Sequence, residues 1–226
     1  MSISRAGLRF AVFDVDDTLY PPDNGLWDEL ANRIEQYLVE RMGVNPADSD
    51  TIRSKYYREH GTTLNGLMYE HPELDPLEYL AFVHDLPYEE LLRPDPELNR
   101  MLADLPLRKV IFTNADRAHA ENVLRHLGIQ DHFEAIVDIV ALDFVNKPNR
   151  AAYKTLLSTL NSPAEACVLM EDSARNIVTA RGMGMTTILI RPSGTDLDGA
   201  HHHVDTVHGV GPLLKRLLNE SQNDLS

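Results

Sequence analysis

One stretch near the start of the chain decides its fold: residues 8–19 read LRFAVFDVDDTL. The first six residues of this stretch, 8–13, are almost all apolar, which predicts a strand buried on both faces. Three mutually repelling carboxylates follow at once, those of Asp14, Asp16 and Asp17. A solvated turn or the start of a helix would tolerate such acids. Because open α/β sheets bind ligands at the carboxyl ends of their strands, we interpret the cluster as a site.

Further along, short apolar runs alternate with helical patterns of about 10 to 12 residues, a spacing typical of βαβ units. This alternation predicts an α/β fold around a central parallel sheet. The expected strands are residues 8–13, 110–113, 136–140, 166–170, 186–190 and 204–207. The expected helices of this part are residues 116–127, 149–160, 173–183 and 211–219.

The region from residue 20 to residue 106 differs, because it contains helical periods and no convincing buried strand. Its expected helices are residues 27–38, 51–60, 77–83 and 94–105. An all-helical insert after the first strand predicts a lid over the carboxyl edge of the sheet. We therefore divide the chain into a catalytic core, residues 1–19 and 107–226, and a helical cap, residues 20–106.

Acidic side chains outnumber basic ones by 35 to 21 among the 226 residues, a net charge of −14. The cap alone has 18 acidic and 7 basic side chains, a net charge of −11. This balance argues against nucleic acid and anionic membranes as partners. The single cysteine, Cys167, excludes an internal disulfide framework and is expected to be a small core residue. We expect a cytoplasmic protein that is a monomer or a homodimer and acts on a small molecule.

The acidic stretch and three later sites resemble, in order, the four motifs of the haloacid dehalogenase superfamily. The matching residues are Asp14-Val15-Asp16-Asp17-Thr18 for the DxDxT signature of its phosphatases, Thr113-Asn114, Lys147-Pro148 and Glu171-Asp172-Ser173. Three of these motifs close predicted strands. The resemblance implies a Rossmann-like core and a phosphatase that works through an aspartyl-phosphate intermediate.

The resemblance also implies the catalytic roles. Asp14 would attack phosphorus, while Asp16 would protonate the leaving oxygen and later deprotonate the hydrolytic water. Thr113 and Lys147 would hold the phosphoryl oxygens, and Asn114 would orient the site. We expect the neighbouring carboxylates to raise the pKa of Asp16, so that it can act as an acid.

A Mg²⁺ cofactor follows from the same resemblance, since magnesium is held by oxygen ligands. Asp14 and Asp172 are the first candidates for side-chain ligands, and Asp16 would contribute its backbone carbonyl. Glu171 would bind directly or through water. Bound cation charge would let a carboxylate approach a phosphate dianion.

The cap narrows the resemblance to the pyrimidine 5′-nucleotidase subgroup. Residues 56–67, YYREHGTTLNGL, resemble its cap signature, and residues 112–116, FTNAD, followed by His119-Ala120, resemble its second motif. The implied substrate is a nucleoside 5′-monophosphate. The candidate contacts in the cap are Tyr57, His60, Thr62, Thr63 and Asn65.

Other functions stay open at this point. Phosphoglycolate or a sugar phosphate could be the substrate of such a phosphatase. A phosphomutase would keep the same first motif. Asp16 weighs against a dehalogenase, which lacks the second aspartate, and intact motifs weigh against a binding module that has lost catalysis.

Overall fold

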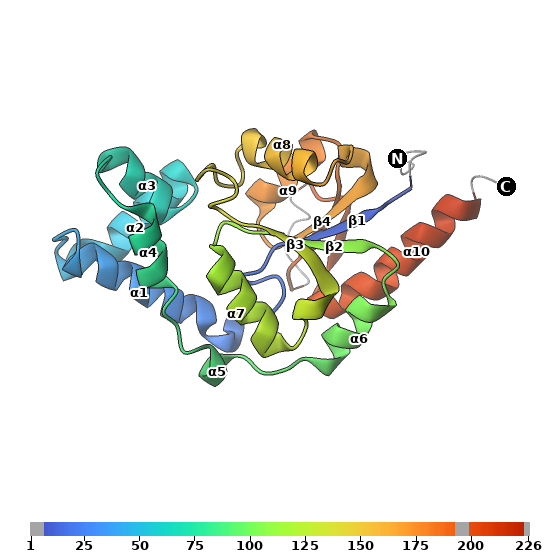
Figure 1. Ribbon diagram of the computed structural model, residues 1–226, viewed down its shortest axis with the longest axis horizontal. Coiled ribbons are helices and arrows are strands. Elements are labelled where there is room, and N and C mark those ends of the chain that lie inside the picture. Colours follow the sequence, from blue (N-terminus) through green and yellow to red (C-terminus); the bar gives the residue numbers. More distant parts are fainter. Residues whose placement is uncertain (1–6, 193–198, 224–226) are drawn as a thin grey trace.

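A computed structural model describes residues 7–192 and 199–223. In this part of the chain six strands form one parallel sheet in the order β3-β2-β1-β4-β5-β6 (Figure 1). The strands are β1 (Phe10–Phe13), β2 (Arg108–Phe112), β3 (Phe133–Val137), β4 (Cys167–Glu171), β5 (Thr186–Ile190) and β6 (His202–Val204). The predicted α/β class is confirmed. Because β1 lies between β2 and β4, the residues that follow these three strands meet at one edge.

Side chains of the central strand alternate between two apolar layers, as a period of two requires. Ala11 and Phe13 pack on the side covered by α7 and α10, whereas Phe10 and Val12 pack on the side covered by α8 and α9 (Figure 1). Cys167 lies fully buried in the second layer, as expected. The covering helices are α7 (Arg117–Leu127), α8 (Arg150–Thr159), α9 (Ala174–Gly182) and α10 (Val210–Asn223).

The limits of α7 follow from two residues that flank it. The Asp116 side chain caps the first turn by accepting a hydrogen bond from the backbone N–H of His119 at 2.8 Å. Gly128 ends the helix at a φ of 71°, a left-handed conformation that favours glycine. The predicted helix therefore lies within one residue of the observed one, and its start is fixed beside the sheet edge.

Four helices of the insert expected to be the cap, α1 to α4, pack together beside the sheet, at the left of Figure 1. Gly66 on α3 lies so close to α2 that an added Cβ would stand 2.4 Å from Cγ of Tyr56. The contact between these two helices therefore requires glycine. The insert contains α1 (Leu26–Glu40), α2 (Ser49–His60), α3 (Thr63–Glu70), α4 (Pro76–Val83), α5 (Tyr88–Leu91) and α6 (Pro96–Asp104).

The last helix of the insert, α6, packs against elements of the core. It packs against α10, and Lys215 pairs with Asp104 at 3.3 Å. Asp95, which caps α6, pairs with His208 at 2.8 Å. These contacts favour an end of the cap before residue 106.

Short 3₁₀ helices lie between these elements: η1 (Pro22–Asn24), η2 (Pro46–Asp48), η3 (Gln130–His132), η4 (Ala164–Ala166) and η5 (Val207–Gly209). None of the described helices combines the length and the apolar composition needed to cross a membrane.

Candidate active site

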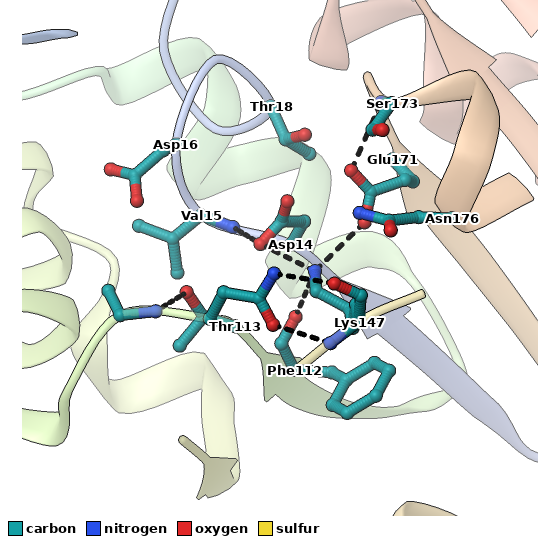
Figure 2. Close-up of polar contacts among 12 residues, drawn as sticks. Asp14, Val15, Asp16, Thr18, Phe112, Thr113, Lys147, Glu171, Ser173 and Asn176 are labelled. Carbon is teal, nitrogen blue, oxygen red and sulfur yellow. Dashed lines mark hydrogen bonds and ion pairs between the residues drawn. The ribbon is translucent and has the colours of Figure 1, made fainter. Parts of the chain in front are cut away.

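The ends of β1, β2 and β4 meet around one buried ammonium group, that of Lys147 (Figure 2). Its Nζ lies 2.9 Å from Oδ1 of Asp14 and 2.8 Å from Oε2 of Glu171. It also donates to the backbone carbonyl of Phe112 at 2.8 Å. Lys147 therefore joins three strands and balances part of the charge of two carboxylates. We call Asp14, Lys147 and Glu171 the charged cluster.

The three contacts of Lys147 bear on its expected role. An ammonium group has three N–H donors, and here they face three protein oxygens. The side chain is fully buried and does not line the cavity described below. In this geometry Lys147 holds the carboxylate of Asp14 in place, and its expected contact with a phosphoryl group stays a prediction.

Asn114 and Thr113 follow β2 and have different partners. Asn114 clamps the backbone of Lys147: its Oδ1 accepts from the Lys147 N–H at 2.7 Å and its Nδ2 donates to the Lys147 carbonyl at 3.1 Å. Thr113 accepts from the N–H of Ala115 at 3.0 Å and lines the cavity. Asn114 thus orients the site, and Thr113 retains a hydroxyl hydrogen for a ligand.

Three carboxylates at this edge could hold a cation. One oxygen each of Asp14, Glu171 and Asp172 lies within 4.8 Å of the others. Burial and the charge of Glu171 raise the pKa of Asp14, and burial together with the charge of Asp14 raises the pKa of Asp172 to about 6. Lys147 alone does not balance these charges. A compact set of oxygen ligands with excess negative charge fits Mg²⁺.

Within this set the carboxylates are not equivalent. Glu171 is fully buried and accepts hydrogen bonds from Lys147 and from the N–H of Ser173 at 3.1 Å. Asp172 accepts a long contact from the Thr18 hydroxyl, at 3.5 Å. Asp172 therefore has the fewest of these contacts to give up to a cation, whereas Asp14 and Glu171 both also accept from Lys147.

We expect Mg²⁺ to stabilise the folded protein, since the unfolded chain has no assembled site. At about one hundred times its dissociation constant a ligand adds about 2.7 kcal/mol. For a chain of this size that raises Tm by about 5–10 °C. Calorimetry with and without a chelator measures the shift, and Asp172→Asn should reduce it. An equal shift in that variant, or with sodium alone, would contradict this assignment.

Asp16 does not have the surroundings that we expected. Figure 2 shows its side chain directed away from the charged cluster. Its Oδ1 accepts from the Tyr20 hydroxyl at 2.6 Å and from Nε2 of His119 at 2.7 Å. Burial raises the pKa of Asp16, but the imidazole and the phenol outweigh burial and lower the pKa to about 2. The prediction of a raised pKa was wrong.

In this stretch the pKa is raised instead at Asp14 and at Asp17. Burial and the charges of Asp16 and Asp14 raise the pKa of Asp17 to about 6. Its φ of 55° is left-handed, and it lies in a turn. His119, by contrast, is a site residue that sequence reasoning missed. The only signal was its place in the FTNAD-RA-HA stretch, one turn after Asp116.

A cavity of about 470 Å³ separates this edge from the cap. Of the five cap residues predicted to contact substrate, Tyr57, Thr62 and Thr63 line it, and His60 and Asn65 do not. Asn65 does not line the cavity because it lies in the first turn of α3, the helix that Thr62 caps. The hydroxyl of Thr62 contacts Oδ1 of Asn65 at 2.6 Å, while Nδ2 of Asn65 donates to the carbonyl of Phe144 at 2.8 Å. The His60 ring lies 5.0 Å from that of Tyr69.

Two curated proteins are similar in sequence to this chain. The chain is 28% identical over 192 residues to Phosphate metabolism protein 8 of Saccharomyces cerevisiae, over 78% of this chain and 60% of that protein. It is 32% identical over 69 residues to Bifunctional epoxide hydrolase 2 of Rattus norvegicus, over 30% of this chain and 12% of that protein. The chain thus spans about 60% or less of the length of these curated relatives.

Among solved structures, a HAD phosphatase from Thermococcus onnurineus matches with a TM-score of 0.63 at 19% identity, over 92% of this chain and 98% of that chain. An L-2-haloacid dehalogenase from Xanthobacter autotrophicus matches with a TM-score of 0.60 at 17% identity, with the same coverage of both chains. At these low identities the two structural matches show a shared fold and no more. The family model of haloacid dehalogenase-like hydrolases matches residues 8–184. The chain therefore belongs to the haloacid dehalogenase-like hydrolases and is an enzyme of the hydrolase class.

Proposed function

We propose that this enzyme is a magnesium-dependent phosphomonoesterase that hydrolyses nucleoside 5′-monophosphates, in the manner of pyrimidine 5′-nucleotidases. The observation that favours a phosphatase over a dehalogenase is the presence of Asp16. This second carboxylate lines the cavity and shares hydrogen bonds with Tyr20 and His119. Halide leaves as a stable anion and needs no proton, whereas an alkoxide leaving group does. The name of the yeast relative, a phosphate metabolism protein, agrees with this choice.

In the first step a carboxylate oxygen of Asp14 forms a bond to phosphorus, and the ester P–O bond breaks on the opposite side. The leaving oxygen receives a proton from Oδ2 of protonated Asp16, which becomes a carboxylate, the form that the hydrogen bonds from Tyr20 and His119 to Oδ1 stabilise. In the second step the oxygen of a water molecule forms a bond to phosphorus while Asp16 takes its proton, and the bond between phosphorus and Asp14 breaks, which releases phosphate and restores the Asp14 carboxylate. Thr113 donates to a phosphoryl oxygen in both steps.

The residues that would hold Mg²⁺ are Asp14, Asp172 and the backbone carbonyl of Asp16, with Glu171 behind them. When bound, the ion neutralises charge on the phosphoryl oxygens and so lets two anions meet. The side chains of Asp14, Glu171 and Asp172 fit that role because their oxygens already converge.

The walls of the cavity support a nucleoside as the leaving group. Trp27 and Tyr57 are 36% and 44% exposed and line the cavity, so aromatic surface is available to a base. Arg58 also lines it and forms no ion pair within residues 7–192 and 199–223, so its guanidinium can donate to base or ribose oxygens. Aliphatic side chains complete the wall, at Leu30, Ile34, Leu80 and Val83. A small polar ester would leave this surface unused.

A panel of phosphomonoesters tests the proposal. We expect the highest kcat/KM for CMP, UMP, AMP or GMP, lower values for phosphoglycolate and glucose 6-phosphate, and loss of activity with a chelator that Mg²⁺ restores. Arg58→Met should raise KM for the nucleotides and leave that for phosphoglycolate unchanged. Preference for phosphoglycolate would contradict the substrate class. Halide release from a 2-haloacid without any phosphate release would contradict the phosphatase itself.

A further inference from the structure

A chain of buried polar side chains runs from Asp16 into the segment that leaves the cap. His119 Nε2 lies 2.7 Å from Oδ1 of Asp16, and His119 Nδ1 lies 2.9 Å from the hydroxyl of Tyr88. That hydroxyl also lies 3.0 Å from the carbonyl of His84. Tyr88 is the first residue of α5, and His84 follows the last residue of α4. The chain thus connects the cap to the second carboxylate of the site.

The His119 ring is held on every side. The side chain has no exposed surface, and its backbone N–H is fixed by Asp116 at the start of α7. The centroid of the His84 ring lies 4.4 Å from that of His119, and His84 lines the cavity. His119 itself does not line the cavity. It therefore acts on a bound substrate only through another residue.

The consequence for Asp16 is a fixed orientation. Both hydrogen bonds, from Tyr20 and from His119, reach the same oxygen, Oδ1. Oδ2 is left as the oxygen that can exchange a proton with a ligand in the cavity. A carboxylate without these two donors would rotate about its side-chain bonds and lose that aim.

We propose that His119 is a positioning residue that aims Oδ2 of Asp16 at the leaving oxygen, and that Tyr88 ties this aim to the position of the cap. The proposal rests on the proposed phosphatase activity. A correctly placed acid or base contributes about 10²–10⁴-fold to rate. Removing the hydrogen bond from His119 to Asp16 should lower the rate by part of this factor. The loss should occur only for esters whose leaving group needs a proton.

The test compares two esters in the first turnover, before hydrolysis of the phosphoenzyme. One is the best nucleoside monophosphate, whose alkoxide must be protonated. The other is p-nitrophenyl phosphate, whose phenolate leaves as a stable anion. His119→Leu should lower the first-turnover rate about 10²-fold or more for the nucleotide and less than about 10-fold for the aryl ester. KM should stay within about threefold, because His119 does not line the cavity.

Two further variants separate positioning from folding. In His119→Gln the amide nitrogen can still donate to Asp16, so at least about a tenth of the nucleotide rate should return. Tyr88→Phe removes only the link to the cap and should cost about 5–10-fold in the same rate. His126→Gln is the matched control on α7, since its ring stacks near Tyr88 outside the chain. It should leave the rate unchanged.

Equal losses for both esters in His119→Leu, or a change in KM alone, would overturn the proposal. So would a His119→Gln variant that is no more active than His119→Leu. Failure of the proposed function has a different signature, because the unmodified enzyme would then release phosphate from neither ester.

Discussion

Asp14→Asn should lower phosphate release by about 10⁴-fold or more, the largest effect expected from a single substitution in this chain. An amide oxygen does not form the acyl phosphate, and the substitution also removes a charge from the expected metal site. The fold should persist, because asparagine keeps the size of the side chain and an oxygen for the Val15 N–H, now 2.8 Å from Oδ1 of Asp14. Steady-state kinetics with the best substrate measures the loss.

Two measurements make the Asp14→Asn result specific. Acid quenching during turnover of a labelled phosphomonoester should leave label on the unmodified protein and none on the variant. Asp131→Asn, a matched change at an exposed position on η3, should keep full activity. More than about a tenth of the activity in Asp14→Asn would place the nucleophile elsewhere.

Lys147→Met should have the largest effect on stability. The substitution leaves Asp14 and Glu171 buried without the ammonium group, and it removes the donor to the Phe112 carbonyl. Breaking a buried ion pair from one side costs about 3–5 kcal/mol. We expect a loss of this size in the free energy of unfolding in the presence of a chelator. Urea unfolding measures it, with activity falling as well because Asp14 loses its anchor.

Magnesium gives the Lys147→Met prediction a second arm. A cation that binds the same carboxylates should restore part of the lost stability, so Mg²⁺ should raise the Tm of the variant more than that of the unmodified protein. Lys109→Met is the control, since Lys109 donates to a backbone carbonyl, that of Leu105. It should cost about 1 kcal/mol. Unchanged stability of Lys147→Met in chelator would show that the carboxylates need no balancing charge.

Sequence patterns predicted the sheet and the charged cluster because both depend on local signals. The apolar runs of β1 and β4 form strands that are buried throughout, whereas the runs at 136–140 and 204–207 only overlap the partly exposed strands β3 and β6. Parallel strands place their carboxyl ends at one edge. Asp14, Lys147 and Glu171 are far apart in sequence, yet each lies at or near such an end, and the structure brings them within hydrogen-bond distance.

Two short helices were missed for physical reasons. In α3, Gly66 lowers the helical propensity of the segment. Glycine is needed there because the Tyr56 side chain packs against it, a tertiary contact that the sequence pattern does not contain. The α5 helix has four residues, too few for a periodic signal. Because α3 was not predicted, Thr62 and Asn65 were expected only as contacts to substrate. In the structure both lie at the start of that helix.

The surroundings of Asp16 could not be predicted because the decisive partner is remote. Adjacent residues in the sequence suggested repulsion from Asp14 and Asp17. In the folded chain the strongest partner is His119, which reaches Asp16 from the first turn of α7. The helix was predicted, but the direction in which its side chains point was not.

The central position of β1 sets the order in which the enzyme can assemble. Phe10 pairs with Arg108 on one side and with Cys167 on the other, and the chain passes through the whole cap before the first of these pairings. Closing a flexible loop of that length costs about 4 kcal/mol of chain entropy, and folds rich in such distant pairings form slowly. Asp14 reaches its final surroundings only when three separate segments have met. In refolding experiments, recovery of catalysis should therefore trail the formation of helix, and a chain emerging from the ribosome should acquire activity only after residue 171 has been released.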